Sequence, residues 1–187
     1  MSTQSSHPPN FFIPTLETPR LRLRPHRPDD FDNSFALWSD PLVFRYISGR
    51  PSSREEVWAR LLRYTGHWLW MRFGFWAVEE KQSGSFVGEV GYAEQMRDIT
   101  PSLAGIPEMG WVLLPIFHGR GYGLEAVLAA QTWFAGEFPS TQTCCIIDSA
   151  NAASIRLAEK IGFCKWQRTT YHGDPLIIFS HGEPRQP

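Results

Sequence analysis

Three glycines separated by single residues, Gly119, Gly121 and Gly123, stand between an apolar strand-like segment, 108–114, and a segment with helical periodicity, 124–134. Glycines let a ligand approach the backbone closely, and the free N–H groups and positive dipole end of a helix N-terminus favour an anion. The same glycines would also suit a tight turn without a ligand. Under either interpretation, a strand, a glycine turn and a helix are contiguous in this chain.

Two common phosphate-binding loops do not fit this segment. A P-loop requires a Lys after its last glycine, and none follows Gly123. A dinucleotide-binding G-x-G-x-x-G fails at Ala126, and the strands before the loop form a hairpin rather than opening a βαβ unit. We therefore do not expect ATP or NAD as the ligand.

The whole chain predicts an α/β fold in the order β-α-α-β-β-β-α-β-α-β-β. Its 187 residues, of which 42% are hydrophobic, suffice for one domain with a substantial core. We expect a flexible arm over residues 1–15, a single domain over 16–181 and a tail over 182–187. The expected strands are 16–24, 73–78, 85–92, 108–114, 141–148, 163–168 and 176–180, and the expected helices begin near Asp29 or Asp30, at Ser52 or Ser53, after the glycine turn and at Asn151.

Charge and residue usage exclude several classes of protein. The 18 basic and 19 acidic residues give a net charge of -1, which argues against a nucleic-acid binder. No apolar run approaches the roughly 20 residues of a membrane-spanning helix, and the polar first ten residues lack a secretory signal, so we expect a cytoplasmic protein without a membrane partner. The histidines lack metal-ligand spacing, so no metal site is predicted. The three cysteines, Cys144, Cys145 and Cys164, are expected to be reduced and mostly buried.

The block EMGWVLLPIFHGRGYGLEA, residues 108–126, resembles the acetyl-coenzyme A binding motif of the GNAT superfamily of N-acetyltransferases, and specifically its RimJ/RimL-like branch. ETPRLRLRP at 17–25, FVGEVGY at 86–92 and NAASIRLAEKIGF at 151–163 are similar to that branch in content and order. The resemblance covers roughly residues 16–179. It implies a mixed, mostly antiparallel sheet that is flanked by helices. This sheet would be splayed at the strand 108–114.

The resemblance also implies how acetyl-CoA binds as a cosubstrate. Its pantetheine would lie along the strand 108–114, and its pyrophosphate would bind the N–H groups of 119–123. The family pattern begins with Gln or Arg where this chain has His118, a departure that leaves the backbone cradle intact. The implied cofactor contacts are Trp111, Val112, Leu113, Leu114, His118, Gly119, Arg120, Gly121, Tyr122, Gly123, Asn151 and Ser154.

Acetyl transfer to an amine requires a base that deprotonates the amine. Glu108 begins the cofactor strand, and Glu89 lies in an otherwise apolar run, where a carboxylate needs an explanation. Both are candidate bases, acting directly or through water. Glu89 could instead be a buried partner of an arginine, and Glu108 an exposed strand end.

The departing thiolate needs a hydrogen-bond donor. Many family members carry a Tyr seven residues after the Asn that caps the last helix, but here that position is Ala158. Ser154 lies one turn earlier on the same helical face and is the candidate thiol contact, although a Ser there also suits a helix start. Asn151 serves both as helix cap and as an implied cofactor contact, and Tyr171 is an alternative donor.

The resemblance implies an N-acetyltransferase that moves an acetyl group from acetyl-CoA to a primary amine by direct attack in a ternary complex. Its acceptor would be a protein N-terminus or a small-molecule amine, and homodimers are common in the family. The missing Tyr and the missing Gln or Arg favour an alternative, a catalytically silent acyl-CoA binding or sensing protein on the same fold. The aromatic residues of the acceptor side could wall a cleft or fill the core; they are Trp38, Phe44, Tyr46, Trp68, Trp70 and Tyr171.

Overall fold

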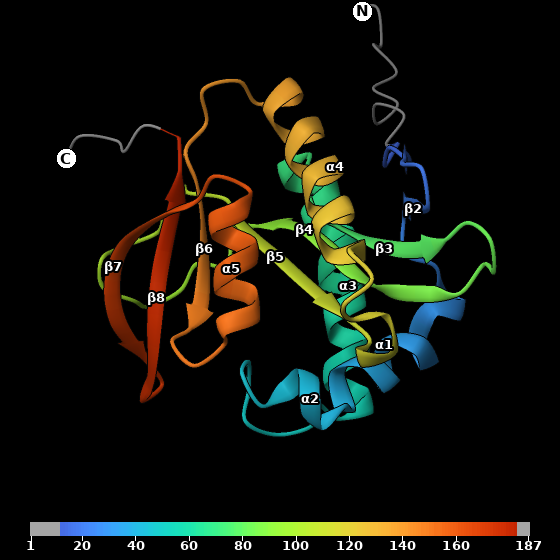
Figure 1. Cartoon of the computed structure of the whole chain (residues 1–187), viewed down its shortest axis with the longest axis horizontal. Helices are drawn as coiled ribbons and strands as arrows, with labels where there is room; N and C mark the ends of the chain where they lie inside the picture. Colours follow the sequence, from blue (N-terminus) through green and yellow to red (C-terminus); the bar gives the residue numbers. More distant parts are fainter. Residues whose placement is uncertain (1–11, 183–187) are drawn as a thin grey trace, which may run out of the picture.

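Residues 12–182 are described by the computed structural model, and their eight strands form one sheet in the order β1-β2-β3-β4-β5-β6-β8-β7 (Figure 1). All neighbouring strands are antiparallel except β5 and β6, which are parallel. The predicted mixed, mostly antiparallel α/β fold is therefore confirmed. The strands are β1 (Leu16–Glu17), β2 (Leu21–Arg24), β3 (Phe75–Glu80), β4 (Phe86–Ala93), β5 (Glu108–Leu113), β6 (Thr143–Asp148), β7 (Cys164–Tyr171) and β8 (Asp174–His181). The helices are α1 (Phe31–Ser39), α2 (Pro41–Phe44), α3 (Arg54–Met71), α4 (Tyr122–Glu137) and α5 (Ala152–Lys160), with 3-10 turns at Pro28–Asp30 and Pro115–Phe117.

The prediction of a single strand over residues 16–24 is wrong, because this segment forms two antiparallel strands, β1 and β2. A turn separates β1 from β2, and in it the Thr18 backbone N–H donates to the Leu21 carbonyl at 2.9 Å. Pro19 lies in this turn, where its fixed φ suits a bend. The inward-facing pair is as predicted, since Leu21 and Leu23 are fully buried.

The element order also contains one helix more than the predicted two before β3. Pro41 ends α1, as its position predicts, but it also begins the short helix α2. The Asp40 carboxylate caps α2 by accepting a hydrogen bond from the Leu42 backbone N–H at 2.8 Å. Proline is favoured at the first helical position because its missing N–H would have no helical acceptor there.

Helices cover both faces of the sheet (Figure 1). The side chains of the sheet therefore pack in two layers, one on each face. On one face, Val90 and Tyr92 pack in the core beneath α4, where the Tyr92 ring stacks on Phe134 with centroids 4.1 Å apart. Alternate residues of a strand point to opposite faces, so Glu89 faces the other layer, where it contacts α1 and α3. Of the two predicted starts of α3, Ser53 is the N-cap, and it forms a capping box with Glu56.

The sheet opens between β5 and β6. Their only paired residues in the described chain are Glu108 and Cys144, and beyond this pair the two strands diverge (Figure 1). On its other side, β5 pairs with β4 along its full length. One edge of β5 is therefore left without a strand partner, as the resemblance implies for the cofactor strand.

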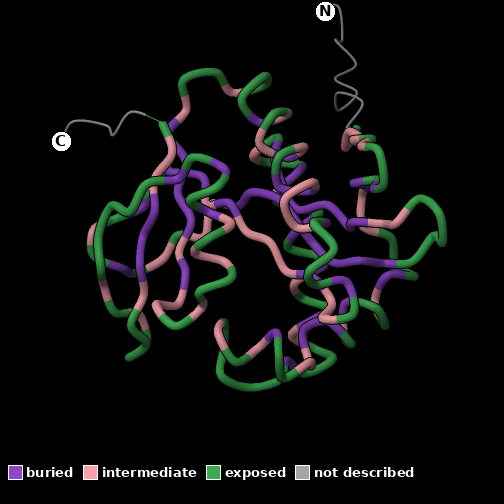
Figure 2. Tube along the Cα trace, in the orientation of Figure 1, coloured by how far each residue is buried: buried purple, intermediate pink, exposed green. Residues whose placement is uncertain are grey.

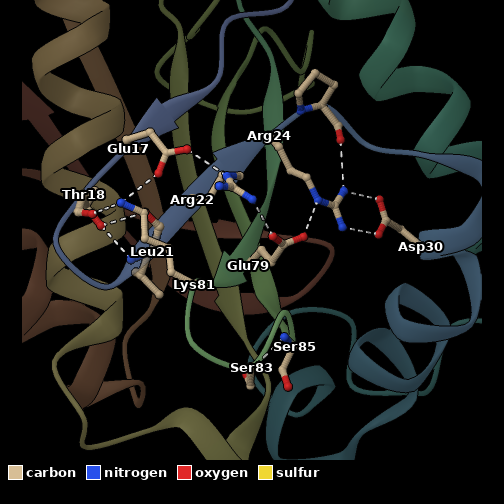
Figure 3. Close-up of polar contacts among 11 residues, drawn as sticks. Glu17, Thr18, Leu21, Arg22, Arg24, Asp30, Glu79, Lys81, Ser83 and Ser85 are labelled. Carbon is tan, nitrogen blue, oxygen red and sulfur yellow. Dashed lines mark hydrogen bonds and ion pairs between the residues drawn. The ribbon is translucent and has the colours of Figure 1, made fainter.

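A network of ion pairs lies along β2 and β3, on the side of the sheet away from the opening (Figure 3). The buried Arg24 guanidinium donates to both Asp30 oxygens at 2.7 Å and through Nε to Glu79 at 2.8 Å. The hydrogen bonds to Asp30 are the main cause of the raised pKa of Arg24. Burial would raise the pKa of Asp30, but hydrogen bonds from Arg24 and the Arg27 backbone lower it overall. This network holds the N-terminal end of α1, at Asp30, against the sheet.

Exposure varies widely between strands (Figure 2). β4 is buried throughout, whereas most of β7, at the sheet edge, is exposed. Cys144 and Cys145 are buried, but the expectation of burial is wrong for Cys164, which is exposed on β7. Between residues 12 and 182 no helix is long and apolar enough to span a membrane. Within the predicted arm, the Pro14 carbonyl accepts a hydrogen bond from Trp76, while residues 1–11 and 183–187 lie outside the described residues.

Candidate active site

The glycine turn delivers the chain from β5 to the N-terminus of α4. Gly119 and Gly121 adopt positive φ angles of 74° and 79°, a conformation that favours glycine. Gly121 is the N-cap, and the first helical hydrogen bond of α4 runs from the Glu125 N–H to the Gly121 carbonyl. The N–H groups of the preceding turn have no acceptor within the helix. They are free to bind an anion, which is the cradle that the glycine spacing predicts.

Side chains on α4 tie this cradle to the first strands. Glu125 accepts hydrogen bonds from the Thr18 hydroxyl and from the Arg20 backbone and side chain, at 2.6 to 2.8 Å. Arg20 also donates to the Arg120 carbonyl at 2.9 Å, and the Tyr122 hydroxyl donates to Glu80. These contacts hold the glycine turn in place.

The structure places the two long side chains of the turn differently, since His118 lines a cavity beside the turn and Arg120 does not. His118 Nε2 lies 2.9 Å from the carbonyl oxygen of Leu113, so its ring folds back onto its own strand. The Arg120 guanidinium lies 5.3 Å from the centroid of the Phe117 ring. Of these two predicted cofactor contacts, His118 thus lines the cavity beside the glycines and Arg120 does not.

Two cavities meet at β5. The first, which we call the β5 groove, runs from the glycine turn along β5 to α5 and includes Leu42, Tyr46, Leu113, Gly119, Gly121, Gly123 and Leu157. The second, the α3 cleft, lies in the opening of the sheet and includes Trp38, Arg60, Arg63, Tyr64, Arg97, Glu108, Asp148 and Tyr171. The residues that line both cavities are Tyr46, Ile47, Trp111, Val112, Asn151 and Ser154. Ligands bound in the groove and in the cleft would meet at these six residues.

The N-terminus of α5 forms one wall of this meeting point. Asn151 caps the helix, and its Oδ1 accepts a hydrogen bond from the Ser154 N–H at 3.1 Å. The Ser154 hydroxyl has no hydrogen-bond partner within residues 12–182 and borders both cavities. Ala158, where many family members have Tyr, is fully buried and lines neither cavity. A free hydroxyl thus stands where the two cavities join.

Glu89 lies behind the wall of the α3 cleft and does not line it. Its carboxylate is completely buried and accepts hydrogen bonds from the Ser34 hydroxyl at 2.8 Å and from Trp38 Nε1 and the Tyr64 hydroxyl at 2.9 Å. No arginine of the described chain hydrogen-bonds to it, so the interpretation of Glu89 as the partner of an arginine is wrong. Trp38 and Tyr64 line the cleft and stand between Glu89 and the cavity.

The environment of Glu89 keeps two neighbouring side chains neutral. Burial, and then the charge of Glu89, raises the pKa of Tyr64 well above its usual range, so its phenol remains protonated. The His26 ring lies 5.1 Å from the Tyr64 ring, and its buried nitrogens have no hydrogen-bond partner in the described chain. Burial lowers the pKa of His26. Glu89 is thus surrounded by neutral donors and rings.

Glu108 is held by an arginine rather than exposed. Arg97 donates to both of its oxygens, at 2.7 and 2.8 Å, and the Glu108 side chain is only 13% exposed. The same guanidinium lies 5.3 Å from the Tyr171 ring centroid. The interpretation of Glu108 as an exposed strand end is therefore wrong, although it does border the cleft.

Sequence reasoning missed two arginines of the α3 cleft. Arg60 and Arg63 lie one turn apart on α3, beside the Tyr64 of its apolar stripe. The Arg60 guanidinium stacks 3.6 Å from the Trp38 ring centroid, and its buried Nε has no partner in the described chain. Partial removal from water, and then the charge of Arg60, lowers the pKa of Arg63. The signal that could have identified these two arginines is their position within one turn of Tyr64, a buried aromatic residue of α3.

The aromatic residues of the expected acceptor side divide between cleft, core and surface. Trp38, Tyr46 and Tyr171 line the α3 cleft. Trp68 is in the core at 2% exposure, whereas Trp70 is 84% exposed. The cleft wall is therefore partly aromatic, but helical spacing alone did not separate these positions.

Comparison with known proteins agrees with this architecture. The family model described as the acetyltransferase (GNAT) domain matches residues 20–164. YkkB of Bacillus subtilis is 31% identical over 168 residues, which cover 88% of this chain and 93% of that protein. A GnaT-family acetyltransferase from Bordetella pertussis has a TM-score of 0.82 at 26% identity, covering 91% of this chain and all of that one.

A more distant structure shares the fold. RimL, a ribosomal L7/L12 alpha-N-protein acetyltransferase solved in complex with coenzyme A, has a TM-score of 0.71 at 14% identity, and the match covers 90% of this chain and 98% of that chain. Since the family model matches most of the chain and the opened sheet is present, the protein belongs to the GNAT acetyltransferase family.

Proposed function

We propose that this protein is an acetyl-CoA dependent N-acetyltransferase that acts on a primary amine by direct attack in a ternary complex. The observation that carries the proposal is that the β5 groove and the α3 cleft meet at six shared residues, which include Trp111, Val112, Asn151 and Ser154. One cavity would hold the acyl donor and the other the amine. Holding two reactants in register is itself a large part of catalysis.

The β5 groove fits coenzyme A. Backbone N–H groups at Gly121 and in the first turn of α4 suit a pyrophosphate. The backbone at Gly119 is open to a ligand, because a Cβ atom placed on this glycine would have no other atom within 4 Å. The unpaired edge of β5 offers backbone groups to a pantetheine arm. When bound, acetyl-CoA supplies the acetyl group as a reactive thioester.

We infer that Glu89 is the terminal base and that Tyr64 connects it to the cleft. An N–H bond of the amine would break as its proton passes to the Tyr64 oxygen, while the Tyr64 proton moves 2.9 Å along its hydrogen bond to Glu89. Glu108 is the poorer candidate, because Arg97 occupies both of its oxygens. Ser154 would donate a hydrogen bond to the departing sulfur, since its hydroxyl is otherwise free at the junction of the cavities.

The test is a free-thiol release assay with acetyl-CoA and a panel of amines that includes short peptides with free N-termini, neutral small amines and polyamines. Glu89→Gln and Tyr64→Phe are expected to lower kcat by a similar factor, about 10²- to 10⁴-fold, as for the loss of a general base. Ser154→Ala, which removes one hydrogen bond, should cost about tenfold. Glu55→Gln, an exposed change on α3, is the matched control for charge.

The outcomes separate the two candidate functions. Amine-dependent thiol release that Glu89→Gln lowers supports the transferase. A rise in Tm with coenzyme A but no thiol release with any amine would favour the silent acyl-CoA binding or sensing protein. Full activity in Glu89→Gln with loss in Glu108→Gln would transfer the role of base to Glu108.

Three finer expectations stay predictions: the RimJ/RimL-like branch, a cytoplasmic location and a homodimer. Four exposed apolar side chains on α3, Trp58, Leu62, Leu69 and Trp70, support a self-association surface. Light scattering coupled to size exclusion would test the dimer, and Trp70→Ser would weaken it if this surface is used.

A further inference from the structure

We propose that the α3 cleft selects amines that also carry a carboxylate, and that Arg60 and Arg63 bind this carboxylate. The inference rests on the proposed function, because it concerns the class of amine that the cleft accepts. The acceptor would be a free amino acid or the N-terminus of a peptide with an acidic side chain nearby. Both sources present the same chemistry, an amine and a carboxylate a few bonds apart.

The first argument is the state of the cleft arginines. Three guanidiniums line the cleft, and Glu108 binds the one on Arg97 through both oxygens. Within residues 12–182, neither Arg60 nor Arg63 has a carboxylate at ion-pair distance. The neighbouring Glu56 is already bound by Arg50. The α3 wall of the cleft thus presents two positive groups that no carboxylate of the described chain contacts at ion-pair distance.

Arg60 is also held in a fixed position. Its guanidinium stacks on the Trp38 ring at 3.6 Å, and its Nε is buried without a hydrogen-bond partner. Glu89 contacts the same indole through the ring N–H and does not contact the guanidinium. A planar guanidinium fixed on an aromatic ring is well suited to bidentate binding of a carboxylate. A ligand in the cleft would be bound by the terminal N–H groups of this guanidinium, since the buried Nε is not accessible.

The charges of the opposite wall support the same class of ligand. Asp148 ends β6 and Asp174 begins β8, and both carboxylates line the cleft across from α3. The cleft is therefore basic on the α3 wall and acidic on the β6–β8 wall. An ammonium carboxylate matches this polarity, whereas a polyamine would place a second cation against Arg60 and Arg63.

The anion would lie close to the reacting amine. Trp38, on which Arg60 stacks, and Tyr64 both donate to the same oxygen of Glu89. Arg63 precedes Tyr64 directly in the chain. The carboxylate site and the inferred route of the amine proton are thus built on adjoining residues, which favours a short spacing between the amine and the carboxylate of the acceptor.

The test measures binding, so that it does not depend on turnover. Isothermal titration with the protein saturated with coenzyme A compares N-acetylglycine with N-acetylglycinamide, and acetyl-Gly-Asp-amide with acetyl-Gly-Asn-amide. The members of each pair differ in one carboxylate, and the two pairs distinguish a free amino acid from an acidic peptide. We expect the anionic member of at least one pair to bind about tenfold more tightly, as for a charged hydrogen-bonded contact.

Variants identify the source of the preference. The double variant Arg60→Gln, Arg63→Gln should bring the two members of the preferred pair to within about twofold. Arg54→Gln, on the same helix but paired with Asp32 outside the cleft, should leave the preference unchanged and controls for net charge. Equal affinities in both pairs, no binding of any probe, or a preference that survives in the double variant would each overturn the inference.

The thiol-release assay separates this inference from the proposed function. A carboxylate preference in titration without thiol release from any amine would remove the transferase but leave the anion site. Thiol release that is fastest with a polyamine would retain the transferase and overturn the anion site.

Discussion

Arg24 and Arg60 show two different uses of a guanidinium held within one fold. Arg24 is 6% exposed, and Asp30 and Glu79 satisfy its donors (Figure 3). Arg60 stacks on Trp38 with a buried Nε that no group of the described chain accepts from. The first guanidinium has its carboxylate partners within the protein, whereas the second has no carboxylate at ion-pair distance among residues 12–182. An arginine that is positioned but unpaired is therefore the more informative feature for function.

The largest expected effect comes from breaking the ion pair between Arg24 and Asp30. Asp30→Ala leaves the Arg24 guanidinium buried with the Glu79 carboxylate and the Pro25 carbonyl as its remaining partners. Loss of one partner of a buried ion pair costs about 3–5 kcal/mol, so the free energy of unfolding should fall by that order in urea titration. A loss below about 0.5 kcal/mol would show that the network is not structurally important.

The same network predicts a dependence on pH. Because the folded protein lowers the pKa of Asp30, the stability that it contributes is complete above the ordinary aspartate pKa of about 4 and is lost as the pH falls through the lower folded value. Unfolding of the wild type should therefore become easier below about pH 4. In the Asp30→Ala variant this part of the acid dependence should be absent, and parallel curves for the two proteins would contradict the assignment.

Glu108 and Arg97 provide an intermediate case that sharpens the comparison. Their side chains are 13% and 27% exposed, so water compensates in part when the pair is lost. Glu108→Gln should lower the free energy of unfolding by about 1 kcal/mol, well below the effect of Asp30→Ala. Chemical denaturation of both variants under identical conditions gives the comparison directly, and equal losses would contradict the ranking by burial.

The smallest effect on stability is expected at the α3 cleft. Arg60→Gln and Arg63→Gln remove no ion pair of the described chain, so each should change the free energy of unfolding by less than about 0.5 kcal/mol. Arg60→Gln also relieves a buried donor, which offsets the loss of its contact with Trp38. A destabilisation as large as that of Asp30→Ala would mean that these arginines are structural.

Features that are local in sequence were predicted well. The glycine turn between 119 and 123 lies within a few residues of the strand and helix that it joins, so spacing alone located it. Ser53 and Asn151 begin their helices as capping residues for the same reason. The break between β1 and β2 was missed because the whole segment 16–24 was assigned to one strand, although the alternation of Leu and Arg begins only at Arg20, after Pro19.

The α3 cleft could not be predicted in the same way, because its members come from distant segments. Arg60 is on α3, Arg97 follows β4, and Asp148 ends β6, and only the opening between β5 and β6 brings them together. The partners of Glu89 likewise come from α1 and α3, so its apolar context indicated burial but not which groups would bind it. Their arrangement depends on tertiary packing, which the pattern of one segment does not contain.

The single paired position between β5 and β6 has a consequence for backbone dynamics. Amides of β5 alternate between hydrogen bonds to β4 and the open edge, so hydrogen exchange along this strand should alternate between slow and fast residues. A molecule lying along the open edge would slow the fast set and leave the other unchanged. Residue-resolved exchange would thus record occupancy of this edge strand by the protection of every second amide.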